Sequence, residues 1–273
     1  MSTPDTARSD TVWVEHVALI DRIPRSLGMA ALLVGFVLAW QLLCMSGAVP
    51  AILLPTPAET GADLLFVGQN LLSGGYVLKA AATTASEMLL GFAIATSLGI
   101  ALGILVGETR FGERAVMPYL VAIDTMPKIA FAPLFVAWLG FGIASKVALA
   151  AFMATFPVVV ATAAGLAAVD ANAQMLFRSM GASRLKTLTR LKLPIALPYF
   201  FAGLKIAAVS VTAGAIAGEF MGGGEGMGQL IRVAAGQLAT ARVFSLIFYL
   251  SLFGLTLFVL VGWIERKVVF WRR

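Results

Sequence analysis

Few residues of this chain could do chemistry, and those in its apolar runs are charged. Asp124 and Lys128 lie four positions apart within one apolar run, close enough to pair on one face of a helix. A charge at membrane depth is costly unless it is paired or lines a polar cavity. Two interpretations therefore stay open: a neutralised pair that tolerates burial, or a pair on a membrane pathway. The other candidate pathway residues are Met126 and Pro127, which lie between this pair, and Glu219, which lies at the end of a later apolar run.

Other chemistries lack their residues. The chain has one Cys, Cys44, so no intrachain disulfide can form. Its one His, His16, lies in the polar N-terminal tail, which excludes a His/Cys metal site, and also a Ser-His-Asp triad unless the tail reaches the bilayer. The glycine-rich stretch 221–228 is not followed by Lys-Ser/Thr, so we interpret it as a flexible turn rather than a phosphate loop. We therefore expect no catalytic, cofactor or metal site.

Composition places the chain in a membrane. Hydrophobic residues make up 60% of it and charged residues 12%, and the mean hydropathy is +0.93. The first apolar run begins too late and is too long for a signal peptide. Prolines 118, 127 and 133 make a straight helix improbable in the third run. The predicted fold is all-α and polytopic, with six transmembrane helices at about 27–45, 80–107, 115–139, 147–168, 195–220 and 243–263.

Small residues predict which of these helices pack closely. Gly91, Ala95, Gly99, Gly103 and Gly107 fall on one ridge at four-residue spacing, which lets a second backbone approach. The second span should therefore be central and packed. The fifth span carries a shorter contact of the same kind at positions 214 and 218.

The positive charges predict an orientation. Fourteen of the 20 Lys and Arg residues fall in the N-terminal tail, at positions 110 and 114, in the loop after the fourth span, and after Trp263. The opposite loops are assigned only Lys79, Lys146, Arg232 and Arg242. Both termini should therefore be cytoplasmic. The net charge of +6 thus reflects topology, and no nucleic-acid partner is expected.

The loop after the fourth span, about 169–194, should be folded. It carries five positive charges, and its residues suit two short helices about a hinge. Asp170 and Ser183 are placed to cap the two helices at their starts. Gly181 suits the turn between them, and Pro194 is expected to end the second.

This loop carries a family resemblance. Gly181-Ala182-Ser183 followed by Leu191-Lys192-Leu193-Pro194 resembles the EAA loop of bacterial ABC importer permeases, and the context most resembles the nitrate/sulfonate/taurine group, over residues 27–273. The resemblance implies a cytoplasmic coupling helix that docks on an ATPase. Met175-Leu176-Phe177 stands where the family usually has Glu-Ala-Ala, so the acidic contact is missing. The implied docking residues are Met175, Leu176, Arg178, Met180, Gly181, Ala182, Ser183, Arg184, Leu185, Leu193 and Pro194.

The resemblance also implies a function. The chain would be a cytoplasmic tail, 1–26, and a single permease domain, 27–273, in the bacterial inner membrane. It would form the path for a small organic or inorganic anion, nitrate-, sulfonate- or taurine-like or an aromatic acid. It would not be an enzyme, because ATP and Mg would bind to an ABC ATPase present in two copies. A second permease copy, identical or different, and a periplasmic or lipid-anchored solute-binding protein would complete the assembly in the lipid bilayer.

One alternative from another class stays open. A secondary transporter or channel would need no ATPase partner. Secondary transporters are often built from internal repeats and need ion sites at the midplane. No convincing repeat is visible, and Glu87, Asp124, Lys128 and Glu219 are few for a proton relay.

Overall fold

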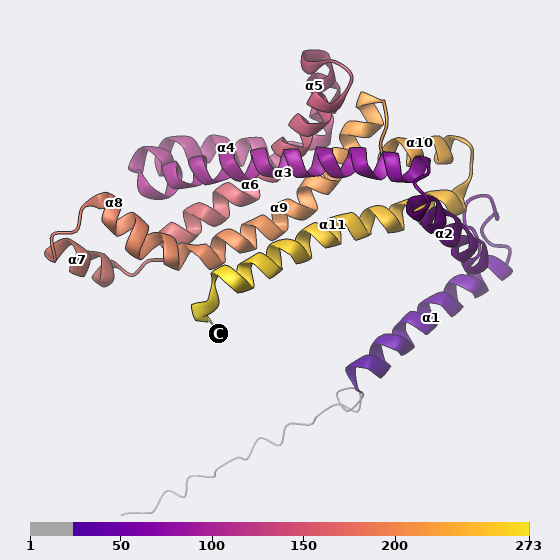
Figure 1. Cartoon of the computed structure of the whole chain (residues 1–273), viewed down its shortest axis with the longest axis horizontal. Coiled ribbons are helices and arrows are strands. Elements are labelled where there is room, and N and C mark those ends of the chain that lie inside the picture. The colour runs from indigo at the N-terminus through magenta and orange to yellow at the C-terminus, as the bar shows by residue number, and fades with distance from the viewer. Residues whose placement is uncertain (1–23, 273) are drawn as a thin grey trace, which may run out of the picture. The chain divides into compact units, whose positions relative to one another are not determined.

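The computed structural model describes residues 24–272, and no strand occurs in that range (Figure 1), which confirms the predicted all-α fold. The long helices are α1 (Arg25–Met45), α2 (Pro57–Leu72), α3 (Tyr76–Glu108), α6 (Ile143–Ala167), α9 (Leu193–Gly222) and α11 (Thr240–Val268). The short ones are η2 (Gly112–Val116), α4 (Met117–Thr125), η3 (Lys128–Phe131), α5 (Ala132–Leu139), α7 (Ala171–Ser179), α8 (Arg184–Thr187), η4 (Leu188–Lys192), α10 (Met227–Gly236) and η5 (Phe270–Arg272).

Five helices in the described residues are long and apolar enough to cross a membrane by themselves. The predicted third span is a bent pair, 112–125 and 128–139, whose halves meet at 89°. The count is therefore six only if this pair is one span. Met126 is extended, with ψ 145°, as a residue before proline prefers, and Pro127 offers no N–H to continue the helix. The predicted interruption is confirmed.

The chain divides into two compact units, residues 1–57 and 58–273. In the described part of the first unit, a proline-rich segment follows α1 and folds back on it. Trp40 Nε1, on α1, donates a hydrogen bond of 3.0 Å to the Pro55 carbonyl of this segment. The predicted N-terminal tail, 1–26, lies almost wholly outside the described residues. The predicted division into tail and permease domain stays a prediction.

The second unit is built around α6, which packs along both α3 and α9. Glycines make this approach possible. A Cβ added to Gly103 of α3 would lie 2.5 Å from the Cβ of Thr162 on α6, and one added to Gly214 of α9 would lie 2.6 Å from the Ala150 Cα. No real Cβ tolerates such contacts. The predicted ridge is therefore confirmed as a helix–helix contact, with Gly91, Gly99 and Gly103 all buried.

The expectation that Pro194 ends the loop's second helix is wrong. A continuous helical stretch runs from residue 184 to 222. The π turn η4 precedes the proline, and the Leu193 amide donates to the Leu188 carbonyl, five residues back. Such a wider turn accommodates a residue that has no N–H and whose ring would crowd the preceding turn. The same arrangement precedes Pro118, where Met117 donates to Gly112.

Candidate functional site

The basic loop folds as two short helices about a glycine hinge, as predicted. At the start of α7, the Ala173 amide donates to Asp170 Oδ2 at 3.1 Å. At the start of α8, the Lys186 amide donates to Ser183 Oγ at 3.3 Å. Gly181 lies between them with φ +72°, a conformation that a side chain would strain. Local capping therefore fixes the shape of the loop.

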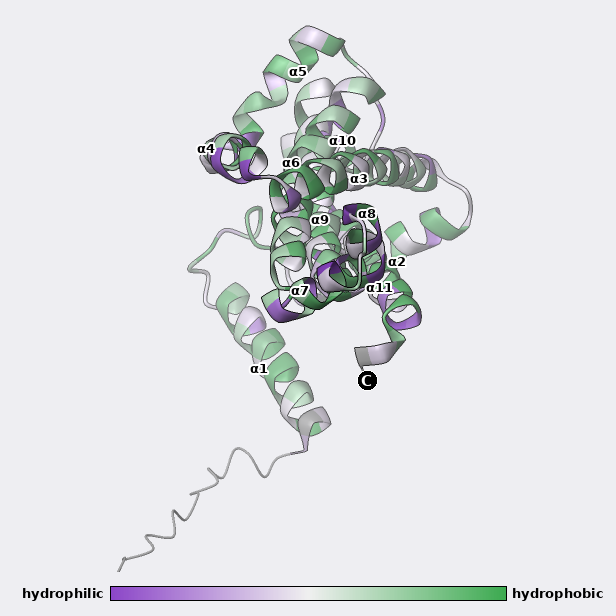
Figure 2. Cartoon of the chain, turned by 90° about the vertical axis from the view of Figure 1, so that its left-hand side faces the viewer, coloured by the Kyte–Doolittle hydropathy of each residue, from purple (hydrophilic) through white to green (hydrophobic). Residues whose placement is uncertain are grey.

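The loop exposes large apolar side chains among its charges. Met175, Leu176, Met180 and Leu185 are 58%, 59%, 74% and 69% exposed. Figure 1 shows α7 and α8 at one end of the long helices, and Figure 2, which faces that end, shows both hydrophilic and hydrophobic stretches on them. Of the remaining predicted docking residues, Arg178, Ser183 and Arg184 are exposed and Ala182 is half-buried; Leu193 and Pro194 lie half-buried in the first turn of α9.

Asp124 and Lys128 form an ion pair, but not on one helical face. Because α4 ends at Thr125 and Lys128 opens η3, the pair bridges the break between the two halves of the bent span. Met126 and Pro127 form the break itself. The predicted pairing is confirmed, while the predicted helical geometry is wrong because proline interrupts the helix between the partners.

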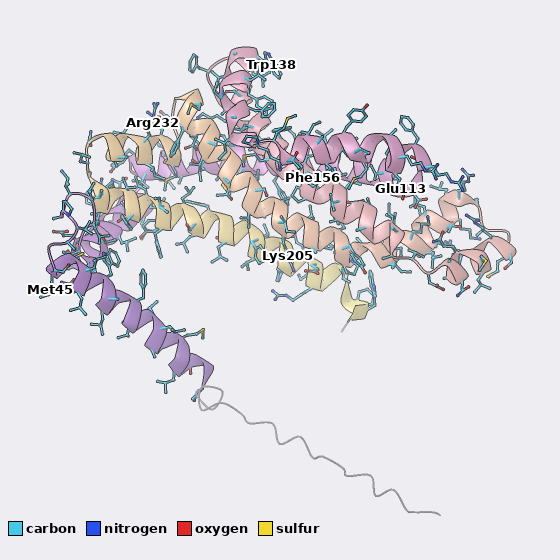
Figure 3. All side chains as sticks on the ribbon, turned by 180° about the vertical axis from the view of Figure 1, so that it is seen from behind. Met45, Glu113, Trp138, Phe156, Lys205 and Arg232 are labelled. Atoms are coloured by element: carbon cyan, nitrogen blue, oxygen red, sulfur yellow. The ribbon has the colours of Figure 1, made fainter. Side chains whose placement is uncertain are left out.

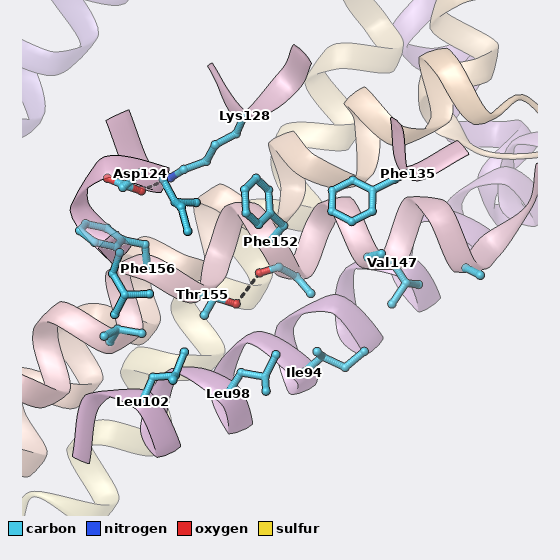
Figure 4. A pocket seen from close by; sticks show the side chains of 16 residues that line it. Ile94, Leu98, Leu102, Asp124, Lys128, Phe135, Val147, Phe152, Thr155 and Phe156 are labelled. Atoms are coloured by element: carbon cyan, nitrogen blue, oxygen red, sulfur yellow. Dashed lines mark hydrogen bonds and ion pairs between the residues drawn. The ribbon is translucent and has the colours of Figure 1, made fainter. Parts of the chain in front are cut away.

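This ion pair lies at an open cavity of about 620 Å³ that is lined by residues of α3, α4, η3, α5 and α6 (Figure 4). The rest of the lining is mostly apolar, with Phe135 and Phe152 directed toward the cavity in Figure 4. Lys128 Nζ lies 5.9 Å from the centre of the Phe156 ring. Figure 3 places Trp138 at the outer end of α5. A cavity of this kind suits the apolar part of a small molecule and offers one charged pair to its polar part.

Glu219, the remaining predicted pathway residue, does not line this cavity. Its carboxylate is fully buried near the end of α9. It accepts hydrogen bonds from the Thr84 hydroxyl and the Gly228 amide, and from the Gln229 amide at 3.3 Å. Because Gly228 and Gln229 lie in the first turn of α10, Glu219 caps that helix from a neighbouring one.

The glycine-rich stretch between α9 and α10 is a turn, as predicted, but it is anchored. Gly223, Gly224 and Gly226 all have positive φ. The Glu225 carbonyl accepts a hydrogen bond of 2.9 Å from Lys146 Nζ. A Cβ at Gly226 would lie 2.2 Å from the Glu219 carboxyl carbon. The glycines therefore serve backbone conformation and close approach.

Residues 95–270 match the family described as binding-protein-dependent transport system inner membrane component. The chain belongs to this family. The permease is 40% identical to the formylaminopyrimidine transport permease protein ThiX of Halalkalibacterium halodurans, over 67% of this chain and 74% of that protein. It is 33% identical to the riboflavin transport system permease protein RibX of Chloroflexus aurantiacus, over 90% of both chains. The alternative of a secondary transporter or channel has no support.

A solved structure shows the same fold. The permease matches a chain from the inward-facing conformations of the MetNI methionine ABC transporter with a TM-score of 0.61 and 19% identity, covering 71% of this chain and 96% of that one. This likeness shows the fold, and the family match and the relatives' names show that the permease is a multi-pass membrane subunit of an ABC importer.

Sequence reasoning missed one buried pair in the permease. Lys146, assigned to an outer loop, lies within α6 and is 2% exposed. Its Nζ is 2.9 Å from Oε1 of Glu87, on α3, which is fully buried. The assignment was wrong because the turn at 140–142 is shorter than expected and α6 already begins at Ile143. The signal was Glu87 itself, a carboxylate inside an apolar span that requires a cation nearby.

Proposed function

We propose that this permease forms the translocation path of an ATP-driven importer for a small organic or inorganic anion, and that a separate ATPase supplies the energy. A relative in Bacillus subtilis, 31% identical, supports an anion, because it is named a putative aliphatic sulfonates transport permease protein, whereas the two relatives above are named for heteroaromatic solutes. The observation that carries the coupling role is the exposed apolar set of the loop, Met175, Leu176, Met180 and Leu185. Exposed apolar patches of this kind mark interaction sites.

The loop is suited to docking because it is folded and sits at one end of the helices. Its hinge and two caps hold the four apolar side chains on a fixed scaffold. Arg178 and Arg184 lie on the same two helices and would pair with acidic groups of the ATPase. Since Met175 replaces the usual family Glu, the contact is more apolar here, and salt should weaken it only modestly.

The expected assembly follows from the family. Two ATPase copies would bind ATP and Mg below a pair of permease copies, and a periplasmic or lipid-anchored solute-binding protein would dock on the opposite side. ATP-driven closure of the ATPase pair would bring the two loops together and shift the pore between inward and outward access, a population shift powered by differential nucleotide binding. The termini and the basic loop would be cytoplasmic, because short positively charged loops stay on that side.

We place the translocation path at the break of the bent span. Asp124 and Lys128 bring two charges to an otherwise apolar cavity, and Met126 and Pro127 shape its edge. Irregular backbone at membrane depth is tolerated where it lines a cavity or is buried in protein. Glu219 is fully engaged at α10, so we assign it to the scaffold of the path rather than to its surface.

The docking role can be tested with two matched glycine substitutions. Gly181 and Gly140 both have positive φ, +72° and +78°, and neither has an atom within 4 Å of an added Cβ. Gly181→Asp and Gly140→Asp therefore introduce the same backbone strain and the same charge at different places. We expect Gly181→Asp to insert in the membrane but to lose co-purifying ATPase and uptake, while Gly140→Asp keeps both. Normal ATPase retention by Gly181→Asp would refute the docking role.

A further inference from the structure

A second, polar cleft lies between the basic loop and the end of α3. It has a volume of about 550 Å³ and is lined by residues that are far apart in the sequence. Arg110 follows α3, Arg178 belongs to α7, Arg184 to α8, and Lys192 to η4. Four cations from four segments therefore face one space.

The cleft is short of negative charge. Among its lining residues the single carboxylate is that of Glu108, and this already pairs with Lys192 at 2.7 Å. In the permease without its ATPase, the guanidinium groups of Arg110, Arg178 and Arg184 line the cleft with no further carboxylate in its lining. Like charges gathered around one space repel each other, and an anion between them relieves this repulsion. The arrangement thus favours an anion in the cleft.

The chemistry of the lining identifies the class of anion. Guanidinium groups present planar forks of N–H donors that match the oxygens of phosphate, often in bidentate pairs. The lining hydroxyls are engaged elsewhere, since Thr109 Oγ1 donates to the Leu105 carbonyl at 2.6 Å and Thr187 Oγ1 to the Ser183 carbonyl at 3.1 Å. Recognition therefore rests on the arginines. We propose that this cleft binds a phosphate group.

The position of the cleft suggests two sources for that phosphate. It lies where α3 ends and just before α9 begins, at the boundary of the membrane-spanning segments. Phe111, next to Arg110, is 67% exposed and could lie against acyl chains. Basic pockets between transmembrane helices on the cytoplasmic side bind anionic lipid headgroups. A lipid headgroup and soluble phosphate share the same chemistry, and experiment separates them.

The test uses the purified full-length permease without its partners, so that its outcome is independent of ATPase docking and transport. Binding of phosphatidylglycerol is followed by native mass spectrometry, and binding of inorganic phosphate by titration calorimetry. The double variant Arg110→Gln with Arg178→Gln should weaken binding at least about tenfold, because hydrogen bonds to charged groups are lost. The control is Arg190→Gln with Arg266→Gln, which removes the same charge from exposed positions outside the cleft.

Two outcomes support the site. Lipid binding that depends on Arg110 and Arg178 but is not displaced by inorganic phosphate identifies a headgroup. Phosphate binding with the same dependence, and displacement of the lipid, identifies a soluble anion. The proposal is overturned if the wild-type permease binds neither probe better than the double variant does. It is equally overturned if the control pair loses as much affinity, because the effect would then be one of overall charge.

Discussion

Lys146→Met should destabilise the permease far more than most single changes. The ammonium group lies 2.9 Å from both Glu87 Oε1 and the Glu225 carbonyl, and the lysine and glutamate side chains are 3% and 0% exposed. Removing the cation leaves the fully buried Glu87 carboxylate without its ion-pair partner. Breaking a buried ion pair by removing one partner costs about 3–5 kcal/mol of unfolding free energy. The lost bond to the turn adds about 1 kcal/mol.

The double variant separates pairing from burial. Lys146→Met combined with Glu87→Gln removes both charges, so its cost should fall below the sum of the single costs by about 2 kcal/mol. Lys205 and Glu265 provide the control, because they also pair between two long helices, α9 and α11, with side chains 29% and 22% exposed. Figure 3 labels Lys205 on α9, which packs against α11. Lys205→Met should cost less than Lys146→Met, because its partner Glu265 is partly exposed and lies in the last turn of α11.

The measurement is reversible unfolding of the purified permease in mixed micelles, with increasing denaturing detergent and far-ultraviolet circular dichroism as the signal. For each pair, the wild type, the two single variants and the double variant are measured. Each of these two cycles gives the coupling energy between the two partners of its pair. If Lys146→Met costs no more than Lys205→Met, the buried pair is not a stabilising element. Additive costs of Glu87→Gln and Lys146→Met would show that the two groups do not interact.

Two further substitutions test the packing and the bent span. Gly103→Leu should lower the free energy of unfolding by about 1–3 kcal/mol, because the larger side chain overpacks against α6. Gly35→Leu is the control and should be near neutral in the same unfolding assay, because no atom lies within 4 Å of an added Cβ. Equal stabilities of the two variants would place the ridge against lipid. Asp124→Asn should reduce uptake, because it leaves the Lys128 charge unpaired at membrane depth, at a cost of about 2.5–3.5 kcal/mol. Adding Lys128→Gln should restore part of the uptake. A double variant as defective as the single one would refute the pairing.

The predictions that succeeded rest on local rules. The caps at Asp170 and Ser183 and the hinge at Gly181 involve groups within three residues of each other, so the sequence contains all the information. The glycine ridge is also readable, because a fixed spacing on one helix predicts close approach whatever the partner is. What the ridge cannot identify is the partner: the choice of α6, through Thr162 and Ala150, depends on tertiary packing.

The predictions that were wrong concern the way the backbone passes a proline, at Pro194 and between Asp124 and Lys128. Pro194 ends a helix by propensity alone, yet here the π turn η4 accommodates it and the helical stretch continues to residue 222. Asp124 and Lys128 have helical spacing, but their pairing survives the loss of the helix because both flank the same break. Spacing thus predicted the contact and not its geometry.

The reassignment of Lys146 strengthens the proposed orientation. The positive-inside bias counts charges that must stay in aqueous loops, and a lysine buried against Glu87 is not one of them. The opposite side then keeps three cations, Lys79, Arg232 and Arg242, against fourteen on the proposed cytoplasmic side. Arg242 is itself held by Asp63, with Nε at 2.8 Å from Oδ1. Because Lys146 was assigned to a loop, its ion pair with Glu87 was missed and the difference in positive charge between the two sides was underestimated. With Lys146 in α6, the buried pair and the proposed orientation are consistent.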